Sequence, residues 1–232
     1  MSIERVFRRE RGGRGLLISV VGFDGSGKTT QIERLGDHFR AQGREVVETR
    51  QPTDWYRELS EVQVFHDQGG SAETAHVLAL LSAADRRRHV MEVVDPALAR
   101  GAVVLCDRYV YATFGVFVHR GVDLDFLVTI NEGVPRPDHA FYLRLPAEDL
   151  VRRLRARDGD KLKHEEKTTA RIESITGTYE RLGDELTVID GTMGRDEVTK
   201  AMIAHMGPDA DASADSDAGP TSDCAGSDAE RG

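Results

Sequence analysis

Gly22-Phe23-Asp24-Gly25-Ser26-Gly27-Lys28-Thr29 is the stretch that decides the fold of this chain. It matches the phosphate-binding pattern G-x-x-x-x-G-K-[ST] at every fixed position. The apolar run Leu16–Val21 before it predicts a buried parallel strand, and Thr29–Gln42 after it predicts a helix, because its apolar residues recur at helical spacing. A glycine loop between a strand and a helix N-terminus gathers backbone N–H groups around one anion. The stretch therefore predicts a site for nucleotide phosphates.

The rest of the chain alternates between apolar runs and longer amphipathic segments. The short apolar runs predict four more strands, at Glu45–Thr49, Ala102–Asp107, His139–Leu145 and Leu186–Asp190. The longer segments predict helices at Trp55–Phe65, Ser71–Val94, Asp125–Asn131, Pro146 to the break at Asp158–Asp160, Glu165–Leu182 and Arg195–Met206. Strands that alternate with helices indicate an α/β fold, in which helices cover both faces of a parallel sheet.

Composition limits where the protein works and what it binds. The 232 residues carry a net charge of −9, of which −6 comes from residues 207–232. We expect a flexible leader at 1–14, one folded domain at 15–206 and a disordered acidic tail at 207–232. The sequence shows no basic face of the kind that binds nucleic acid. It also contains no apolar run that approaches the length of a membrane span. Cys106 and Cys224 do not suggest a disulfide framework, so the cytoplasm is the expected compartment.

Three motifs together resemble one family. Phe23–Gln31, Ala83–Arg86 and Asp107-Arg108-Tyr109, in this order and at these spacings, resemble the thymidylate kinases. The Asp-Arg-Tyr motif after an apolar strand is the most specific part, because the phosphate loop alone occurs in many families. The resemblance covers Gly15 to Leu182. It implies a P-loop NTPase fold with five parallel strands in the order 2-3-1-4-5, a homodimer, and Mg²⁺-dependent transfer of the ATP γ-phosphate to a nucleoside monophosphate.

The donor side of the site follows from the loop and from the third strand. Lys28 is expected to reach the β- and γ-phosphates, and Thr29 and Asp107 are the expected Mg²⁺ ligands, directly or through water. The residues expected to bind ATP are Gly22, Phe23, Asp24, Gly25, Ser26, Gly27, Lys28, Thr29 and Thr30. The resemblance implies that Arg108 bridges the two substrates' phosphates. The alternative for Asp107 and Arg108 is an ordinary ion pair at a strand end.

An arginine-rich segment is expected to close over the site as a lid at about 152–166. Some thymidylate kinases carry an arginine at the loop position that is Gly25 here, and others take that charge from the lid. With Gly25, the resemblance implies that Arg153, Arg155 or Arg157 supplies it, without indicating which. The alternative is a solvated helix face whose charges pair with Glu165 and Glu166.

The acceptor side departs from the family pattern. The resemblance suggests an acceptor site formed by Asp24, Arg50, Arg57, Ser82, Arg86, Arg108, Tyr109 and Ala112, and leaves open whether Arg50 or Arg57 meets the acceptor phosphate. Ser82 stands where the family usually has a phenylalanine that stacks on thymine, and Ala112 replaces a usual serine. The usual Ala-Tyr-Gln-Gly is Gly115-Val116-Phe117-Val118.

Three functions remain open from the sequence. The first is a kinase with dTMP as its default acceptor. The second is a kinase of the same fold that acts on a different or modified nucleotide, since the acceptor residues differ. The third is a nucleotide-binding protein without catalysis. The arginine-rich segment argues against the third, because a protein that only binds a nucleotide needs no clamp for an acceptor.

Overall fold

The computed structural model describes residues 3–8, 14–159 and 161–207. It contains one five-stranded sheet of β1 (Leu16–Val21), β2 (Val46–Arg50), β3 (Val103–Asp107), β4 (His139–Arg144) and β5 (Thr187–Asp190). The strands lie in the order β2-β3-β1-β4-β5, and every neighbouring pair is parallel. The predicted fold class and strand order are therefore confirmed.

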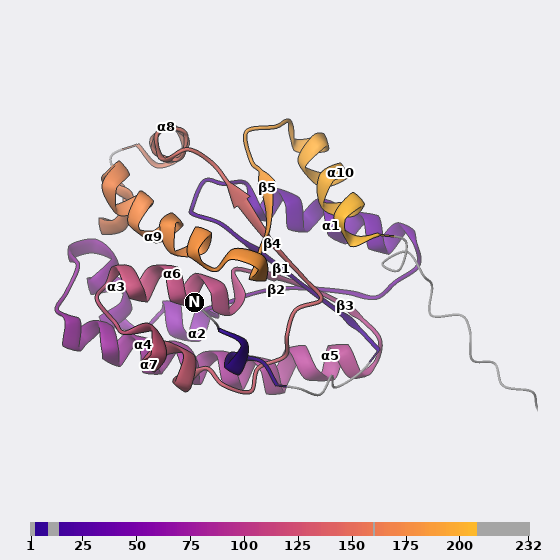
Figure 1. Cartoon of the computed structure of the whole chain (residues 1–232), viewed down its shortest axis with the longest axis horizontal. Coiled ribbons are helices and arrows are strands. Elements are labelled where there is room, and N and C mark those ends of the chain that lie inside the picture. The colour runs from indigo at the N-terminus through magenta and orange to yellow at the C-terminus, as the bar shows by residue number, and fades with distance from the viewer. Residues whose placement is uncertain (1–2, 9–13, 160, 208–232) are drawn as a thin grey trace, which may run out of the picture.

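Helices cover the sheet on both faces (Figure 1). One face packs against α1 (Lys28–Ala41) and α10 (Arg195–Met206), and the other packs against the helices between β2 and β5. Because side chains alternate along a strand, Ile18 and Val20 of β1 point to the first layer while Leu17 and Val21 point to the second. The apolar runs are buried on both sides, which is why they carry no alternation in sequence.

The second layer is built from many short helices. They are α2 (Asp54–Arg57), α3 (Ser60–Gln68), α4 (Ala72–His89), α5 (Asp95–Ala99), α6 (Tyr109–His119), α7 (Leu124–Ile130), α8 (Ala147–Asp158) and α9 (Thr169–Arg181). The single helix expected at Trp55–Phe65 is two helices, because Leu59 is extended. The helix expected over Ser71–Val94 is α4, which continues through a π-helical turn into α5, and Pro96 lies in the first turn of α5.

Helix α6 is the element that the sequence did not indicate. Eight of its residues are buried, among them Tyr109, Phe114 and Phe117. A helix that is apolar on all sides has no hydrophobic stripe, so its sequence lacks the periodicity by which the other helices are found. Its position matters, since α6 begins directly after Asp107 and Arg108 and forms one wall of the site described below.

The N-terminal residues correct one expectation. Ile3, Val6 and Phe7 are buried, and Arg8 Nη2 lies 2.7 Å from Asp95 Oδ1. Residues 3–8 therefore pack on the domain and are not a flexible leader, because Ile3, Val6 and Phe7 join its apolar core and Phe7 forms a backbone bridge with Val134. Residues 9–13 of the expected leader, Asp160 of the expected lid, and residues 208–232 of the expected tail lie outside the described residues. Within the described part of the chain, no helix is both long and apolar enough to cross a membrane.

Candidate active site

The site lies at the carboxyl ends of β1 and β3, where open α/β sheets bind their ligands. β1 and β3 pair with Val20 opposite Asp107, so the loop after β1 and the motif after β3 meet at one edge. The loop turns through Gly25 (φ 83°) and Gly27 (φ 97°), conformations that glycine adopts without strain. Lys28 opens α1, and its Nζ donates to the Phe23 carbonyl oxygen at 3.0 Å, while Thr29 and Thr30 follow in the first turn.

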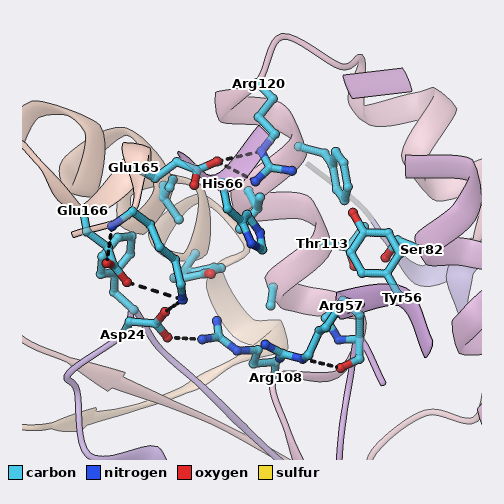
Figure 2. Close-up of a pocket in the computed structure, with 18 residues that line it drawn as sticks. Asp24, Tyr56, Arg57, His66, Ser82, Arg108, Thr113, Arg120, Glu165 and Glu166 are labelled. Carbon is cyan, nitrogen blue, oxygen red and sulfur yellow. Dashed lines mark hydrogen bonds and ion pairs between the residues drawn. The ribbon is translucent and has the colours of Figure 1, made fainter. Parts of the chain in front are cut away.

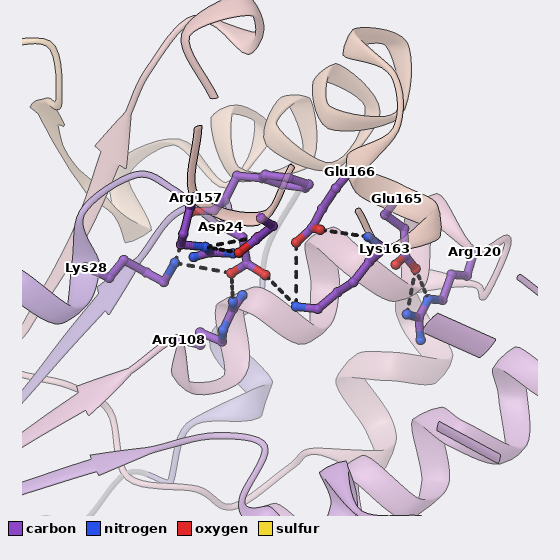
Figure 3. Close-up of polar contacts among 10 residues, drawn as sticks. Asp24, Lys28, Arg108, Arg120, Arg157, Lys163, Glu165 and Glu166 are labelled. Atoms are coloured by element: carbon purple, nitrogen blue, oxygen red, sulfur yellow. Dashed lines mark hydrogen bonds and ion pairs between the residues drawn. The ribbon is translucent and has the colours of Figure 1, made fainter. Parts of the chain in front are cut away.

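Three cationic side chains converge on the Asp24 carboxylate (Figure 3). Arg108 Nη2 donates to Oδ1, Lys163 Nζ donates to Oδ2 at 2.9 Å, and Lys28 Nζ lies 3.8 Å from Oδ1. Burial by itself raises the pKa of Asp24, but Arg108, Lys28 and Lys163 together lower it well below its usual value. The cations would repel one another without this anion. The same cluster suits the negative charge of phosphate groups.

The surroundings of Lys28 in the ligand-free protein disfavour the positive charge of its amine. The side chain is 5 % exposed. Burial, followed by the nearby Arg108 guanidinium, lowers the pKa of Lys28 to about 8. An anionic ligand that enters the loop would relieve this repulsion, because an opposite charge favours the protonated amine.

The backbone at the end of β3 aims Arg108 at the loop. Arg108 has φ 79° and Tyr109 has φ 52°, and they are the two non-glycine residues with positive φ in the part of the chain that is described. Such conformations are costly and persist only where surrounding structure enforces them, which is typical of functional sites. Here the Arg108 N–H donates to the Val20 carbonyl oxygen at 2.9 Å and α6 begins at the next residue. Burial lowers the pKa of Arg108, but Asp24 and Asp107 outweigh it, so the pKa is raised and the guanidinium stays charged.

Thr29 and Asp107, the expected metal ligands, line the same open cavity beside α1. The Asp107 Oδ1 atom is buried and has no hydrogen-bond partner among the described residues. Buried carboxylate oxygens normally have a partner, and a bound cation would provide one here. Hydroxyl and carboxylate oxygens suit Mg²⁺, which keeps several waters and needs few protein ligands. The described residues contain no cluster of three or more His, Cys, Asp or Glu side chains that could hold a metal.

A second cavity, with about 770 Å³ of empty space, opens beside Asp24 (Figure 2). Arg57 and Arg108 lie together at one end of this acceptor cavity, and the Arg57 Nε donates to the Pro52 carbonyl oxygen at 2.8 Å. Burial, then Arg108 and Arg50, lower the pKa of Arg57. Arg50 instead pairs with Asp54 and faces the cavity that contains Thr29 and Asp107. The structure therefore brings Arg57, and not Arg50, to the acceptor cavity.

The remaining residues expected on the acceptor side divide into two groups. Ser82 and Ala112 line the acceptor cavity. Arg86 and Tyr109 are not among its lining residues: Arg86 is 1 % exposed and donates to side-chain oxygens of Gln51, Thr113 and Asn131, and the Tyr109 hydroxyl donates to the Pro135 carbonyl oxygen. Arg86 thus stands behind the cavity wall and holds Thr113, which does line the cavity.

The three arginines expected in a lid lie on α8, and one of them, Arg153, contacts the loop. Arg153 lies 3.4 Å from the carbonyl oxygens of Gly25 and Gly191, Arg155 is exposed, and Arg157 Nη2 lies 2.6 Å from Asp158 Oδ2. The alternative expectation, in which these arginines pair with Glu165 and Glu166, is not met. Glu165 pairs with Arg120, and Glu166 pairs with Lys163. The segment contributes Lys163 rather than an arginine to the Asp24 cluster.

Another side of the acceptor cavity carries a polar group that the sequence did not indicate. The Arg120 Nη2 and Glu165 Oε1 atoms are 2.6 Å apart, and these side chains are 4 % and 10 % exposed. The Arg120 guanidinium also lies over the Phe65 ring at 4.4 Å. Burial, followed by Arg120, lowers the pKa of nearby His66 to about 4, so this imidazole is neutral at physiological pH. Arg120 directly follows α6. Because the sequence does not indicate this helix, it also does not place Arg120 near the cavity.

The buried Arg120–Glu165 pair is expected to stabilise the fold strongly. We expect Glu165→Ala to lower the free energy of unfolding by about 3–5 kcal/mol, because it leaves a buried guanidinium without its partner. Urea unfolding measures the change. Glu45→Ala is the matched control: Glu45 pairs with Arg100 at 2.8 Å, but both side chains are about half exposed, so its loss should cost less than about 1 kcal/mol. Equal effects of the two substitutions would contradict this assignment.

A phosphate loop, a cation cluster around one carboxylate and a second cavity on the far side of that cluster define a P-loop kinase with an acceptor site. The family model for thymidylate kinase matches residues 20–202. The chain belongs to the thymidylate kinase family. Members of this family phosphorylate dTMP to dTDP with ATP, and the chain is an ATP-dependent phosphotransferase of this kind.

Curated relatives agree with this family. The chain is 44 % identical to a probable thymidylate kinase of Pyrococcus abyssi over 149 residues, which cover 62 % of this chain and 72 % of the relative. It is 36 % identical to a thymidylate kinase of Halothermothrix orenii over 203 residues, covering 80 % and 93 %. It is 34 % identical to a thymidylate kinase of Desulfotalea psychrophila over 168 residues, covering 72 % and 82 %.

Proposed function

We propose that this chain transfers the γ-phosphate of ATP to the 5′-phosphate of dTMP, with the two substrates meeting at Asp24, Lys28 and Arg108. The observation that carries the proposal is the Asp24 carboxylate, which holds Lys28, Arg108 and Lys163 between the phosphate loop and the acceptor cavity. In phosphoryl transfer, catalysis comes mainly from positioning and from neutralising charge on the transferred group. Three cations between two anion sites meet that requirement.

Each substrate has a distinct set of residues in this proposal. The loop amides and Lys28 hold the β- and γ-phosphates of ATP. Arg57 holds the acceptor phosphate, since it is the arginine at the end of the acceptor cavity nearest Arg108. Arg108 spans the two phosphates, because its planar guanidinium offers several donors in one fork. Arg153, beside the loop, is the lid arginine best placed to reach the ATP phosphates.

Mg²⁺ is part of the proposal, with Thr29 and Asp107 as its protein ligands, directly or through water. The ion would neutralise phosphate charge and fix the geometry of the triphosphate. We expect Asp107→Asn to raise the Mg²⁺ concentration needed for half-maximal rate by roughly tenfold or more, because the buried unpaired oxygen loses its charge. Mg²⁺ titration at saturating ATP measures this, with the exposed Asp196→Asn as control. An unchanged Mg²⁺ requirement would exclude Asp107 as a ligand.

The acceptor is the part of the function that needs direct testing. A coupled assay that follows ADP release, with dTMP, dUMP, dCMP and dGMP offered in turn, ranks the acceptors by kcat/KM. We expect dTMP to rank first. The second candidate is a modified nucleotide, and the observation that favours it is the cavity wall, where Ser82, Val116 and Phe117 stand at positions that depart from the family pattern.

A homodimer is also proposed. Val64 on α3 and Val77 and Leu80 on α4 are each about half exposed, and these helices form one outer side of the domain (Figure 1). Val77 and Leu80 are three residues apart on α4 and so share one helix face, and an exposed apolar face favours an interface. Most soluble oligomers are symmetric dimers. Light scattering during size-exclusion chromatography should give the mass of two chains for the wild type and of one for Leu80→Arg. A wild-type monomer would contradict the dimer.

A further inference from the structure

The Ser82 hydroxyl is a buried polar group that the cation cluster does not explain. Ser82 is 1 % exposed, and its Oγ has no hydrogen-bond partner among the described residues. Serine inside a helix usually donates to the carbonyl oxygen four residues earlier, but Ser82 in α4 makes no such bond. Buried hydroxyls without partners are rare in folded proteins and disfavour the folded state. The Ser82 hydroxyl is therefore free to bond a ligand that reaches it.

The place of Ser82 indicates which ligand. Ser82 lines the acceptor cavity, where Figure 2 shows it beside Tyr56 and Thr113, away from the end that holds Asp24. The Thr113 hydroxyl at this wall accepts from the buried Arg86, whereas the Ser82 hydroxyl has no partner among the described residues. The surrounding lining is apolar, with Ala112, Val116 and Phe117 among its members. An apolar slot with a few placed polar groups is the usual form of a site for a flat ring.

The two ends of the cavity match the two ends of a nucleoside monophosphate. Arg108 offers donors for a phosphate beside Asp24, and Ser82 offers an unpaired hydroxyl at the wall away from Asp24, next to Tyr56. We propose that the Ser82 hydroxyl hydrogen-bonds the base of the bound acceptor and is a specificity-determining residue for it. This inference rests on the proposed function, because it assumes that the acceptor phosphate occupies the end with Arg57 and Arg108.

The chemistry of a hydroxyl defines the acceptor class. Because it can donate or accept, Ser82 can pair with a base that presents either a carbonyl oxygen or an amino group. A base that presents only carbon at this point would leave the Ser82 hydroxyl unpaired, and a site built to hydrogen-bond its substrate rejects such analogues strongly. The inferred class is therefore nucleoside monophosphates whose base carries a polar exocyclic group toward α4.

Ser82→Ala tests the inference, because it removes one oxygen and leaves the packing otherwise unchanged. We expect the Kd for dTMP, measured by calorimetry, to rise roughly tenfold, as the loss of one net hydrogen bond implies. The Kd for 2-deoxyribose 5-phosphate, which has no base, should not change. The melting temperature of the ligand-free variant should equal or exceed that of the wild type, since an unpaired buried hydroxyl is lost.

Ser19→Ala is the matched control. Ser19 lies in β1, is 0 % exposed, and its Oγ also has no partner among the described residues, but it does not line the acceptor cavity. Its substitution should leave both Kd values unchanged. An unchanged Kd for dTMP in Ser82→Ala, or an equal rise for dTMP and for 2-deoxyribose 5-phosphate, would overturn the inference. Wild-type protein that binds dTMP without phosphorylating it would count against the proposed function alone, because the binding comparison does not depend on turnover.

Discussion

Replacement of Arg108 by alanine is expected to lower kcat by about 10³-fold or more, while the protein stays folded. The expected size follows from other phosphoryl transfer enzymes, in which an arginine on the transferred group contributes to this extent. Arg108 is the residue that links the two halves of the site, because its guanidinium donates to Asp24 and lines the acceptor cavity. Its backbone is held at φ 79°, a conformation that directs the side chain to this point.

The Arg108→Lys variant separates the contribution of the positive charge from that of the planar guanidinium. Arg108→Lys keeps a positive charge but loses the planar fork, so it should recover little of the rate. Arg100→Ala removes an exposed arginine that pairs with Glu45 and should leave kcat unchanged. Steady-state kinetics with saturating ATP and dTMP, together with a thermal melt, gives both readouts. A folded Arg108→Ala enzyme with wild-type kcat would remove Arg108 from the mechanism.

Replacement of Lys28 by alanine is expected to lower kcat by about 10²- to 10³-fold, as the loss of one preorganised donor to developing charge does in other enzymes. The ligand-free protein should be no less stable than the wild type. The reason is that burial and Arg108 already lower the pKa of Lys28 to about 8, so the empty site disfavours its positive charge. The variant should therefore lose activity without losing stability. Such a trade-off is common at sites that are built for a ligand.

Two measurements check Lys28. Initial rates give kcat, and a thermal melt of the ligand-free protein gives the stability. Lys200→Ala on α10 is the control, because this lysine is exposed and distant from the loop in the sequence. A Lys28→Ala variant that melts well below the wild type would mean that the side chain supports the fold, and the loss of activity would then say little about catalysis.

The sequence predicted the parts of the fold that depend on local pattern. The phosphate loop was recognisable because its glycines and Lys28 have fixed spacing, and the five strands were recognisable as short apolar runs between helices. Helix α6 was not, because it is buried on every side and has no amphipathic period. Its absence from the prediction hid Arg120 and Thr113, which line the acceptor cavity.

The sequence named candidate site residues, but it could not give the contacts that they make. Sequence alone left Arg50 and Arg57 equivalent, and the difference came from the turn after β2, which sends Arg50 to Asp54 and Arg57 into the cavity. The partner of Asp24 from the segment that was expected to form a lid is Lys163, because the chain after α8 folds back over the loop. Contacts between residues 139 positions apart depend on tertiary structure, and no local pattern records them.

The most direct test of the account follows one phosphoryl group from donor to acceptor. The purified chain is incubated with Mg²⁺, dTMP and ATP labelled in its γ-phosphate, and the products are separated by anion exchange. We expect labelled dTDP in equal amount to the ADP formed. ADP with labelled inorganic phosphate and no labelled dTDP would contradict it, because Asp24, Lys28 and Arg108 would then not be joining two substrates.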